Sequence, residues 1–289
     1  MNTSGVRLVS PAGDVTPIAL PLRLMLAQLL VQPYGPQGVR PLLMALAAAG
    51  LVSPRVLEAP LTWIAITILL TLRLVAEWPM PDNHVYLKTY FCAAVAIALL
   101  LPRSARALAR SSRLLIGCAF AFAVLWKAGL SSDYVDGRFF RVTLLSDRRF
   151  DDVVGLIGGL AEAEVRENRQ YLTSLPEGDE PSEVMRLHEP AGVHNLALAA
   201  TWGAVLLEGT VALTFLWAGA GLRGVRHAAL LAFTVLTYAF APVPGFGWLL
   251  LAMGLCDTHP GEGRLRAAYL IVFVVVLFSA EAQWGVLLR

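Results

Sequence analysis

Long runs of apolar residues constrain this chain more than any other feature. Leu61–Leu72, Phe91–Leu101 and Tyr269–Phe278 contain no charged residue, and with their apolar neighbours they approach the roughly 20 residues that cross a bilayer as a helix. Apolar residues make up 57% of the chain and charged residues 15%, whereas about 45–50% and about 25% are usual in soluble domains. The sequence therefore predicts an integral membrane protein made of helices.

Six segments are predicted to span the membrane, and together they predict an all-α, polytopic transmembrane helix bundle that forms a single membrane domain over residues 1–289. The predicted spans cover residues 57–79, 85–102, 112–130, 192–220, 227–256 and 265–287. The fifth contains Pro242 and Pro244, which predict a kinked or broken helix because proline donates no backbone hydrogen bond. Residues 17–52 contain arginines and prolines, and predict either one more span with a short helix or a pair of interfacial helices.

The arginines predict the orientation. Residues 103–113 contain four arginines and no acidic residue, which places them in the cytoplasm by the positive-inside rule. Residues 221–227, with two more arginines, should then be cytoplasmic, whereas 131–191 and 256–264 should lie outside. We expect the protein in a bacterial inner (cytoplasmic) membrane.

Residues 131–191 form the one sizeable polar region. They contain 13 acidic residues and seven arginines, a net charge of −6. Apolar and charged residues alternate over 139–160, which suits helices lying on the membrane surface, whereas 175–182, with two prolines and three acidic residues, predicts a solvated turn. We expect a helical extracytoplasmic cap over the outer helix ends, able to dock a membrane protein partner. No nucleic-acid partner is expected.

The three cysteines, Cys92, Cys118 and Cys256, lie in or beside apolar runs, with no CxxC pair and no neighbouring histidine. This pattern favours packing residues over a metal site or a disulfide framework. We therefore expect no metal.

Lys127 is the first candidate functional residue. The chain has only two lysines, Lys88 and Lys127, and Lys127 lies one turn from the outer end of an apolar span. An ionisable residue there predicts a function, since a desolvated lysine can lose its proton; snorkelling to the interface is the structural alternative. His84 is predicted on the same outer side, where its imidazole could hold the lysine amine or simply cap a helix.

Three other charged residues lie inside predicted spans. Arg73 and Glu77 are four residues apart, and therefore share a helix face and should form an ion pair. Glu208 has no partner nearby in sequence, so it must face the bundle interior, either protonated or paired with an arginine. Four aromatic residues at the outer level fit an interfacial belt: Trp78, Tyr86, Trp126 and Tyr134.

Four short motifs resemble the horizontally transferred transmembrane domain family, which includes the vitamin K-dependent gamma-glutamyl carboxylase. They are Asn83-His84-Val85-Tyr86-Leu87, Lys127 followed by Asp133-Tyr134-Val135-Asp136-Gly137, Leu206-Leu207-Glu208, and Phe246-Gly247-Trp248 followed by Leu251-Ala252-Met253. They occur in the family's order, with similar separations, over roughly residues 60–255. An ungapped comparison puts Gly129 at the family's lysine position, so Lys127 lies two residues early and the match needs a local insertion or distortion. Thr234 falls where the carboxylase has a histidine.

The resemblance implies a site for a reduced quinone of the menaquinone, ubiquinone or vitamin K type, with Lys127 as the catalytic base and His84 as its orienting partner. No counterpart of the carboxylase's large outer domain follows the last span, so peptide carboxylation is not expected. We expect the remaining ligand-binding residues to be Arg73, Glu77, Asn83, Tyr86, Asp133, Tyr134 and Glu208.

Three functions stay open at this point. The first is a quinone- or lipid-using membrane oxidoreductase. The second is a non-catalytic scaffold or accessory subunit of a larger membrane complex, docked through 131–191. The third is a transporter, for which the charges inside the spans and the broken fifth span are the motive.

Overall fold

A computed structural model of the chain describes residues 18–32, 38–79, 81–172, 187–217, 219–240, 243 and 245–278. All regular secondary structure in these ranges is helical, which confirms the all-α class. The turn predicted over 175–182 lies outside the described residues, as do Pro242 and Pro244.

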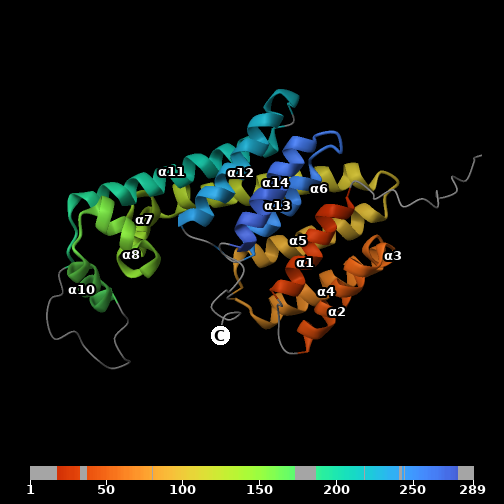
Figure 1. Cartoon of the computed structure of the whole chain (residues 1–289), viewed down its shortest axis with the longest axis horizontal. Helices are drawn as coiled ribbons and strands as arrows, with labels where there is room; N and C mark the ends of the chain where they lie inside the picture. The colour runs from red at the N-terminus through yellow and green to blue at the C-terminus, as the bar shows by residue number, and fades with distance from the viewer. Residues whose placement is uncertain are drawn as a thin grey trace, which may run out of the picture.

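The helices fall into three groups along the chain (Figure 1). The first group is α1 (Ala19–Val31), α2 (Val39–Val52), α3 (Pro54–Leu57), α4 (Pro60–Ala76), α5 (Asn83–Leu99) and α6 (Ser104–Val124), which continues as the π-helix η1 (Leu125–Leu130). The second is α7 (Ser132–Val135), α8 (Arg138–Ser146), η2 (Arg148–Phe150), α9 (Asp151–Val153), the π-helix η3 (Val154–Gly158) and α10 (Glu162–Leu172). The third is α11 (Ala191–Leu216), η4 (Ala220–Leu222), α12 (Arg223–Phe240), α13 (Phe246–Cys256) and α14 (Gly263–Val276).

Two helices in the described part of the chain are long and apolar enough to cross a membrane, judged by length and composition. They are Ser104–Leu130, with 27 residues, and α11, with 26. They pack antiparallel, because Gly117 meets Leu216 towards one end and Lys127 meets Glu208 towards the other. The predicted bundle of six full spans is not confirmed. For example, α4 and α5 have 17 residues each, about 26 Å of helix against a hydrocarbon core of about 30 Å.

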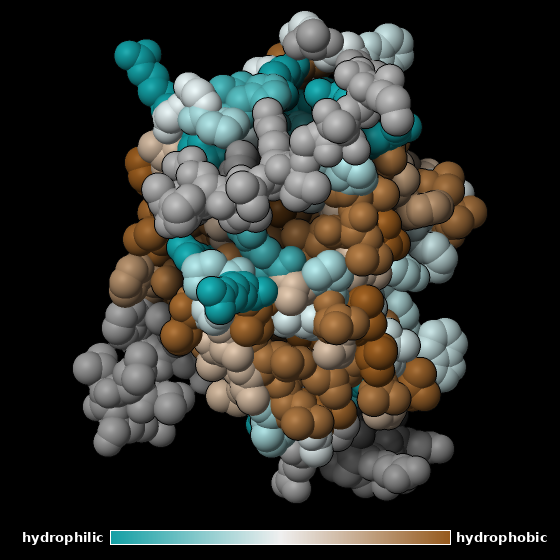
Figure 2. Space-filling view, turned by 90° about the vertical axis from the view of Figure 1, so that its right-hand side faces the viewer, coloured by the Kyte–Doolittle hydropathy of each residue, from teal (hydrophilic) through white to brown (hydrophobic). Residues whose placement is uncertain are grey.

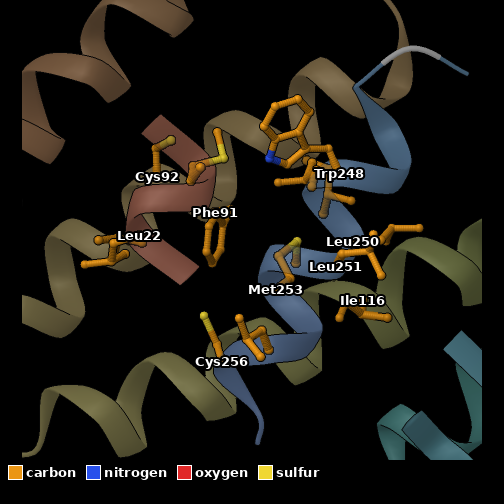
Figure 3. Packing of buried hydrophobic residues seen from close by; sticks show 14 of the residues in the cluster. Leu22, Phe91, Cys92, Ile116, Trp248, Leu250, Leu251, Met253 and Cys256 are labelled. Carbon is orange, nitrogen blue, oxygen red and sulfur yellow. The ribbon is translucent and has the colours of Figure 1, made fainter. Parts of the chain in front are cut away.

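Helix α13 forms the centre of the main hydrophobic core. Every residue from Gly247 to Cys256 is buried, against α1, α5 and α6 (Figure 3). The Trp248 indole donates a hydrogen bond to the Leu24 carbonyl at 2.8 Å, and the Gln28 amide donates one to the Gly245 carbonyl at 2.5 Å. Helix α1 is therefore a core helix, which disagrees with the second of the two alternatives for residues 17–52, a pair of interfacial helices. With 13 residues, it is also too short to form a full span.

The predicted span 227–256 is two antiparallel helices. Near the turn that joins them, the Gly247 amide donates a hydrogen bond to the Tyr238 hydroxyl at 2.7 Å. At the other end, the Arg226 guanidinium lies 3.0 Å from the Asp257 carboxylate. The predicted break is confirmed, but a single crossing is wrong because the chain reverses between Phe240 and Phe246.

This reversal changes the position of the connection 256–264. Its Glu262 carboxylate lies 2.7 Å from the Arg223 guanidinium, so the connection is at the same end of the bundle as residues 221–227. The expectation that the two connections lie on opposite sides is therefore wrong. A 30-residue apolar stretch looks like one long span, and only the contacts between its halves reveal the hairpin.

Single-cysteine labelling should detect this shared side. Gly221 and Gly261 have open space around an added Cβ, so cysteines placed there in a Cys118→Ala background should be labelled by an impermeant maleimide from the same face of sealed vesicles. A cysteine at exposed Glu162 of the cap, as the reference for the other end, should be labelled from the opposite face. If Gly261→Cys and Glu162→Cys are labelled from the same face of the vesicles, the hairpin is contradicted.

The cap has a small hydrophobic core of its own. It contains Leu144, Leu145, Phe150, Val154, Leu160 and Val165, packed on Val193 and Ala197 of α11. In Figure 1 the cap helices α7, α8 and α10 gather at the N-terminal end of α11, away from α1–α4. On α11, the cap core ends at Ala197 and the main core begins at Val211. Of the residues between them, Leu207 packs on the edge of the main core, and Thr201, Val205 and Glu208 are buried outside both cores.

Apolar side chains also cover much of the surface. Hydrophobic residues spread over the face in Figure 2, with hydrophilic residues at its upper edge and in a smaller patch between. Val52, Leu61 and Val75 are among the large apolar residues that are mostly exposed. Extended exposed apolar surface marks a membrane or protein contact, which agrees with membrane association.

Candidate functional site

Lys127 and Glu208 form an ion pair between η1 and α11. The Lys127 Nζ atom lies 2.5 Å from Glu208 Oε1, and the two side chains are 23% and 8% exposed. The expectation that Glu208 faces the interior is confirmed, but its partner is a lysine and not an arginine. The pair joins residues 81 positions apart, so no local sequence pattern could have matched them.

The π-helix η1 sets the direction of Lys127. A π-helix has more residues per turn than an α-helix, so it rotates the side chains that follow relative to those before it. The π-helical stretch covers Leu125–Leu130 and so includes Lys127. Such π-helical turns occur frequently at functional sites.

Tyr134 closes one side of the pair. The Lys127 Nζ atom lies 5.1 Å from the centre of the Tyr134 ring, a cation–π distance. Phe139 and Phe140 pack on the same ring at 5.4 and 5.7 Å. Burial, and then the charge of Glu208, raise the pKa of Tyr134 above its ordinary value. The hydroxyl therefore stays protonated and can donate a hydrogen bond.

The second carboxylate oxygen of Glu208 is an unsatisfied acceptor. Oε2 is buried and has no hydrogen-bond partner within the described ranges. A buried acceptor without a donor is costly, and such an atom marks a position where a ligand or water donates. The site therefore consists of the Lys127 amine paired with Glu208 Oε1, the unpaired Glu208 Oε2 atom and the ring of Tyr134.

Asp133 belongs to a different, exposed cluster. Its carboxylate lies 2.8 Å from the Arg138 guanidinium, which also contacts Asp136 at 3.0 Å. Gly137 follows with a φ of 79°, where a side chain would be strained and where an added Cβ would lie 3.0 Å from Leu198. This loop brings α8 against α11 and does not place Asp133 at the ion pair.

His84 interacts with a different set of residues from Lys127. Its ring is 4.0 Å from the Asp82 carboxylate, and the charges acting on it are those of Lys88, Asp82 and Arg73. No hydrogen bond or ion pair joins His84 to Lys127 in the described structure. The lysine within electrostatic reach of His84 is Lys88, one turn further along α5. Asn83, at the start of α5, is exposed.

Arg73 and Glu77 form the predicted pair. Arg73 Nε lies 2.9 Å from both Glu77 oxygen atoms, which confirms the i,i+4 interaction on α4. Tyr86 lies nearby and, with Leu74, Val75 and Trp78, lines a shallow apolar hollow of about 320 Å³. These residues lie on the surface of α4 and α5 and are not part of the site around Lys127 and Glu208.

The sequence interpretation missed one buried lysine and one cluster of buried polar residues. Lys88 is fully buried inside a predicted span, and the rule that selected Lys127 could have selected it too. A buried polar cluster lies at the end of α11 away from the cap, and it contains Arg226, His227, Asp257 and Tyr269. Beside them, the hydrogen bond from Arg223 lowers the pKa of Glu262 to about 2.

The described residues contain no group of three or more histidine, cysteine, aspartate or glutamate side chains that could hold a metal ion. Cys92 and Cys256 are buried and Cys118 is exposed, all three as free thiols. No protein-family model, no curated protein and no solved structure matches this chain. The functional argument therefore rests on the chemistry of the site.

Proposed function

We propose that this is a polytopic membrane protein that binds a reduced quinone or a similar ring compound at Lys127 and Glu208 and removes a proton from it. The free Oε2 atom of Glu208, next to an oxygen held by Lys127, is the observation that carries the proposal. The proposal includes membership of the carboxylase-like membrane family and an extracytoplasmic position for the cap.

The geometry favours a division of roles that differs from the one the resemblance implies. A lysine amine held 2.5 Å from a carboxylate carries its proton and is not a base in that state. Glu208 Oε2 is then the proton acceptor: the ligand O–H bond breaks, its electron pair stays on the ring oxygen, and the proton moves to Oε2. The Lys127 ammonium stabilises the resulting anion, as preorganised charges do in enzyme sites.

Glu208→Gln tests this division of roles. The glutamine keeps the size of the side chain and an acceptor for Lys127, but it cannot take up a proton. Bound naphthoquinol should ionise at neutral pH in the wild type, visible as the absorbance of the quinolate, and most of this signal should be lost in the variant because the glutamine amide cannot accept the ligand's proton.

Glu262→Gln is the matched control, because it also removes one carboxylate from an ion pair, the one with Arg223, and Glu262 is not among the expected ligand-binding residues. It should ionise the bound quinol as the wild type does. An undiminished quinolate signal in Glu208→Gln would exclude the proposal, and so would an equal loss in both variants.

A non-catalytic scaffold is the second candidate. It is favoured by Leu156 and Ile157 of η3, which are 87% and 59% exposed on a cap that could dock a membrane partner. Purification in mild detergent separates the two functions: a stable partner lost on Leu156→Ser, with no bound quinone in the wild type, would favour the scaffold.

A further inference from the structure

Thr201 differs from most of the other helical threonines. Seven of them donate the hydroxyl to the carbonyl four residues earlier, as is usual in a helix: Thr67, Thr71, Thr89, Thr143, Thr210, Thr214 and Thr234. Thr201 is fully buried, yet its Oγ1 atom has no hydrogen-bond partner among the residues that the structure describes. Its hydroxyl is therefore an unsatisfied buried group.

Thr201 shares the buried face of α11 with Glu208. That face contains Val193, Ala197, Thr201, Val205 and Glu208, of which only Thr201 and Glu208 are polar. Both lie in the stretch between the cap core and the main core, and both carry a buried oxygen atom without a partner. Two such atoms on one face point to a ligand that contacts both.

The spacing limits the size of that ligand. Seven residues of α-helix rise about 10 Å, and both side chains tilt towards the helix N-terminus, so the longer glutamate reaches back towards Thr201. A ligand that lies between the two side chains, in line with two hydrogen bonds of about 2.8 Å each, then has its two oxygen atoms about 5 Å apart. Oxygen atoms at opposite positions of one six-membered ring fit this spacing.

We propose that Thr201 and Glu208 bind the two opposite oxygen atoms of one planar ring, so that the site recognises ring compounds with oxygen at both ends. This rests on the proposed function and adds a specificity residue to it. Glu208 contacts the oxygen that loses its proton, next to Lys127, and Thr201 contacts the other oxygen. Tyr134 and its neighbouring phenylalanines provide an aromatic surface close to the ion pair.

The test compares two ligands and two variants. The ligands are para-naphthoquinol and a naphthol with a single hydroxyl, and the variants are Thr201→Val and the control Thr234→Val, which is equally buried but has its hydroxyl bonded within its own helix. Thr201→Val should weaken binding of the quinol about five- to tenfold, the worth of one hydrogen bond, and leave the naphthol unchanged. Thr234→Val should change neither affinity. Thermal unfolding midpoints of both variants show whether they are folded.

Each other outcome overturns the inference. Equal weakening of both ligands would mean that Thr201 acts through packing, and no weakening would mean that its hydroxyl binds only water. If Glu208→Gln abolishes quinolate formation while Thr201→Val has no effect on binding, the proposed function stands and the role of Thr201 falls. If the wild type binds neither ring compound, both fall.

Discussion

Replacing Lys127 by alanine should destabilise the protein by about 3–5 kcal/mol. The substitution leaves Glu208, whose side chain is only 8% exposed, as a buried carboxylate without its cation, and an uncompensated buried charge costs that amount. Unfolding of the purified protein in detergent, followed by circular dichroism against temperature and denaturant, measures the loss.

The double variant Lys127→Met/Glu208→Met is the control. Removing both charges leaves no uncompensated ion, so most of the stability should return, to within about 1–2 kcal/mol of the wild type. If the single and double variants are equally unstable, the two residues do not interact. Glu208→Gln tests function better than Lys127→Ala because glutamine keeps a hydrogen-bond acceptor for Lys127, which is the more exposed partner at 23%, so less stability should be lost together with activity.

Arg226→Ala should have the second large effect, also about 3–5 kcal/mol. Arg226 is 3% exposed and joins three segments of the chain. It donates to the Thr214 and Trp217 carbonyls at the C-terminal end of α11, at 2.8 and 3.0 Å, and to the Asp257 carboxylate at 3.0 Å. Its loss leaves a buried carboxylate and two helix-end carbonyls unsatisfied, so the contact between α11 and the α12–α13 hairpin should weaken.

Arg223→Ala is the comparison for Arg226→Ala. Arg223 also binds an acidic residue, Glu262, but the two side chains are 27% and 31% exposed, and water can replace much of the interaction. We expect a loss of about 1 kcal/mol or less, as for other solvent-accessible ion pairs. Equal losses in Arg223→Ala and Arg226→Ala would show that burial is not what makes the Arg226 cluster important.

The sequence predicted local properties well and distant contacts poorly. The helical class and the Arg73–Glu77 pair depend on residues within one or two turns of each other, and the structure confirms both. The partner of Glu208 and the direction of α13 depend on contacts between segments far apart in the chain, and the expectations for both were wrong. The pairing of His84 with Lys127 was inferred because both were predicted at the same side of the membrane. A shared side gives the position of a residue along its helix, but it does not say which helices are neighbours.

Composition and hydrophobic runs by themselves determined that this chain forms apolar helices, because the preference of a segment for an apolar environment depends on its own side chains. The sequence also marked Lys127 and Glu208 as unusual, since a charge within an apolar run stands out without any structure. Only the tertiary structure decided which charges meet, because the antiparallel packing of α6 and α11 and the π-helical turn of η1 bring Lys127 to Glu208. It also decided that Thr201 and Glu208 Oε2 are buried without partners, since burial and hydrogen bonding depend on every element that packs around them.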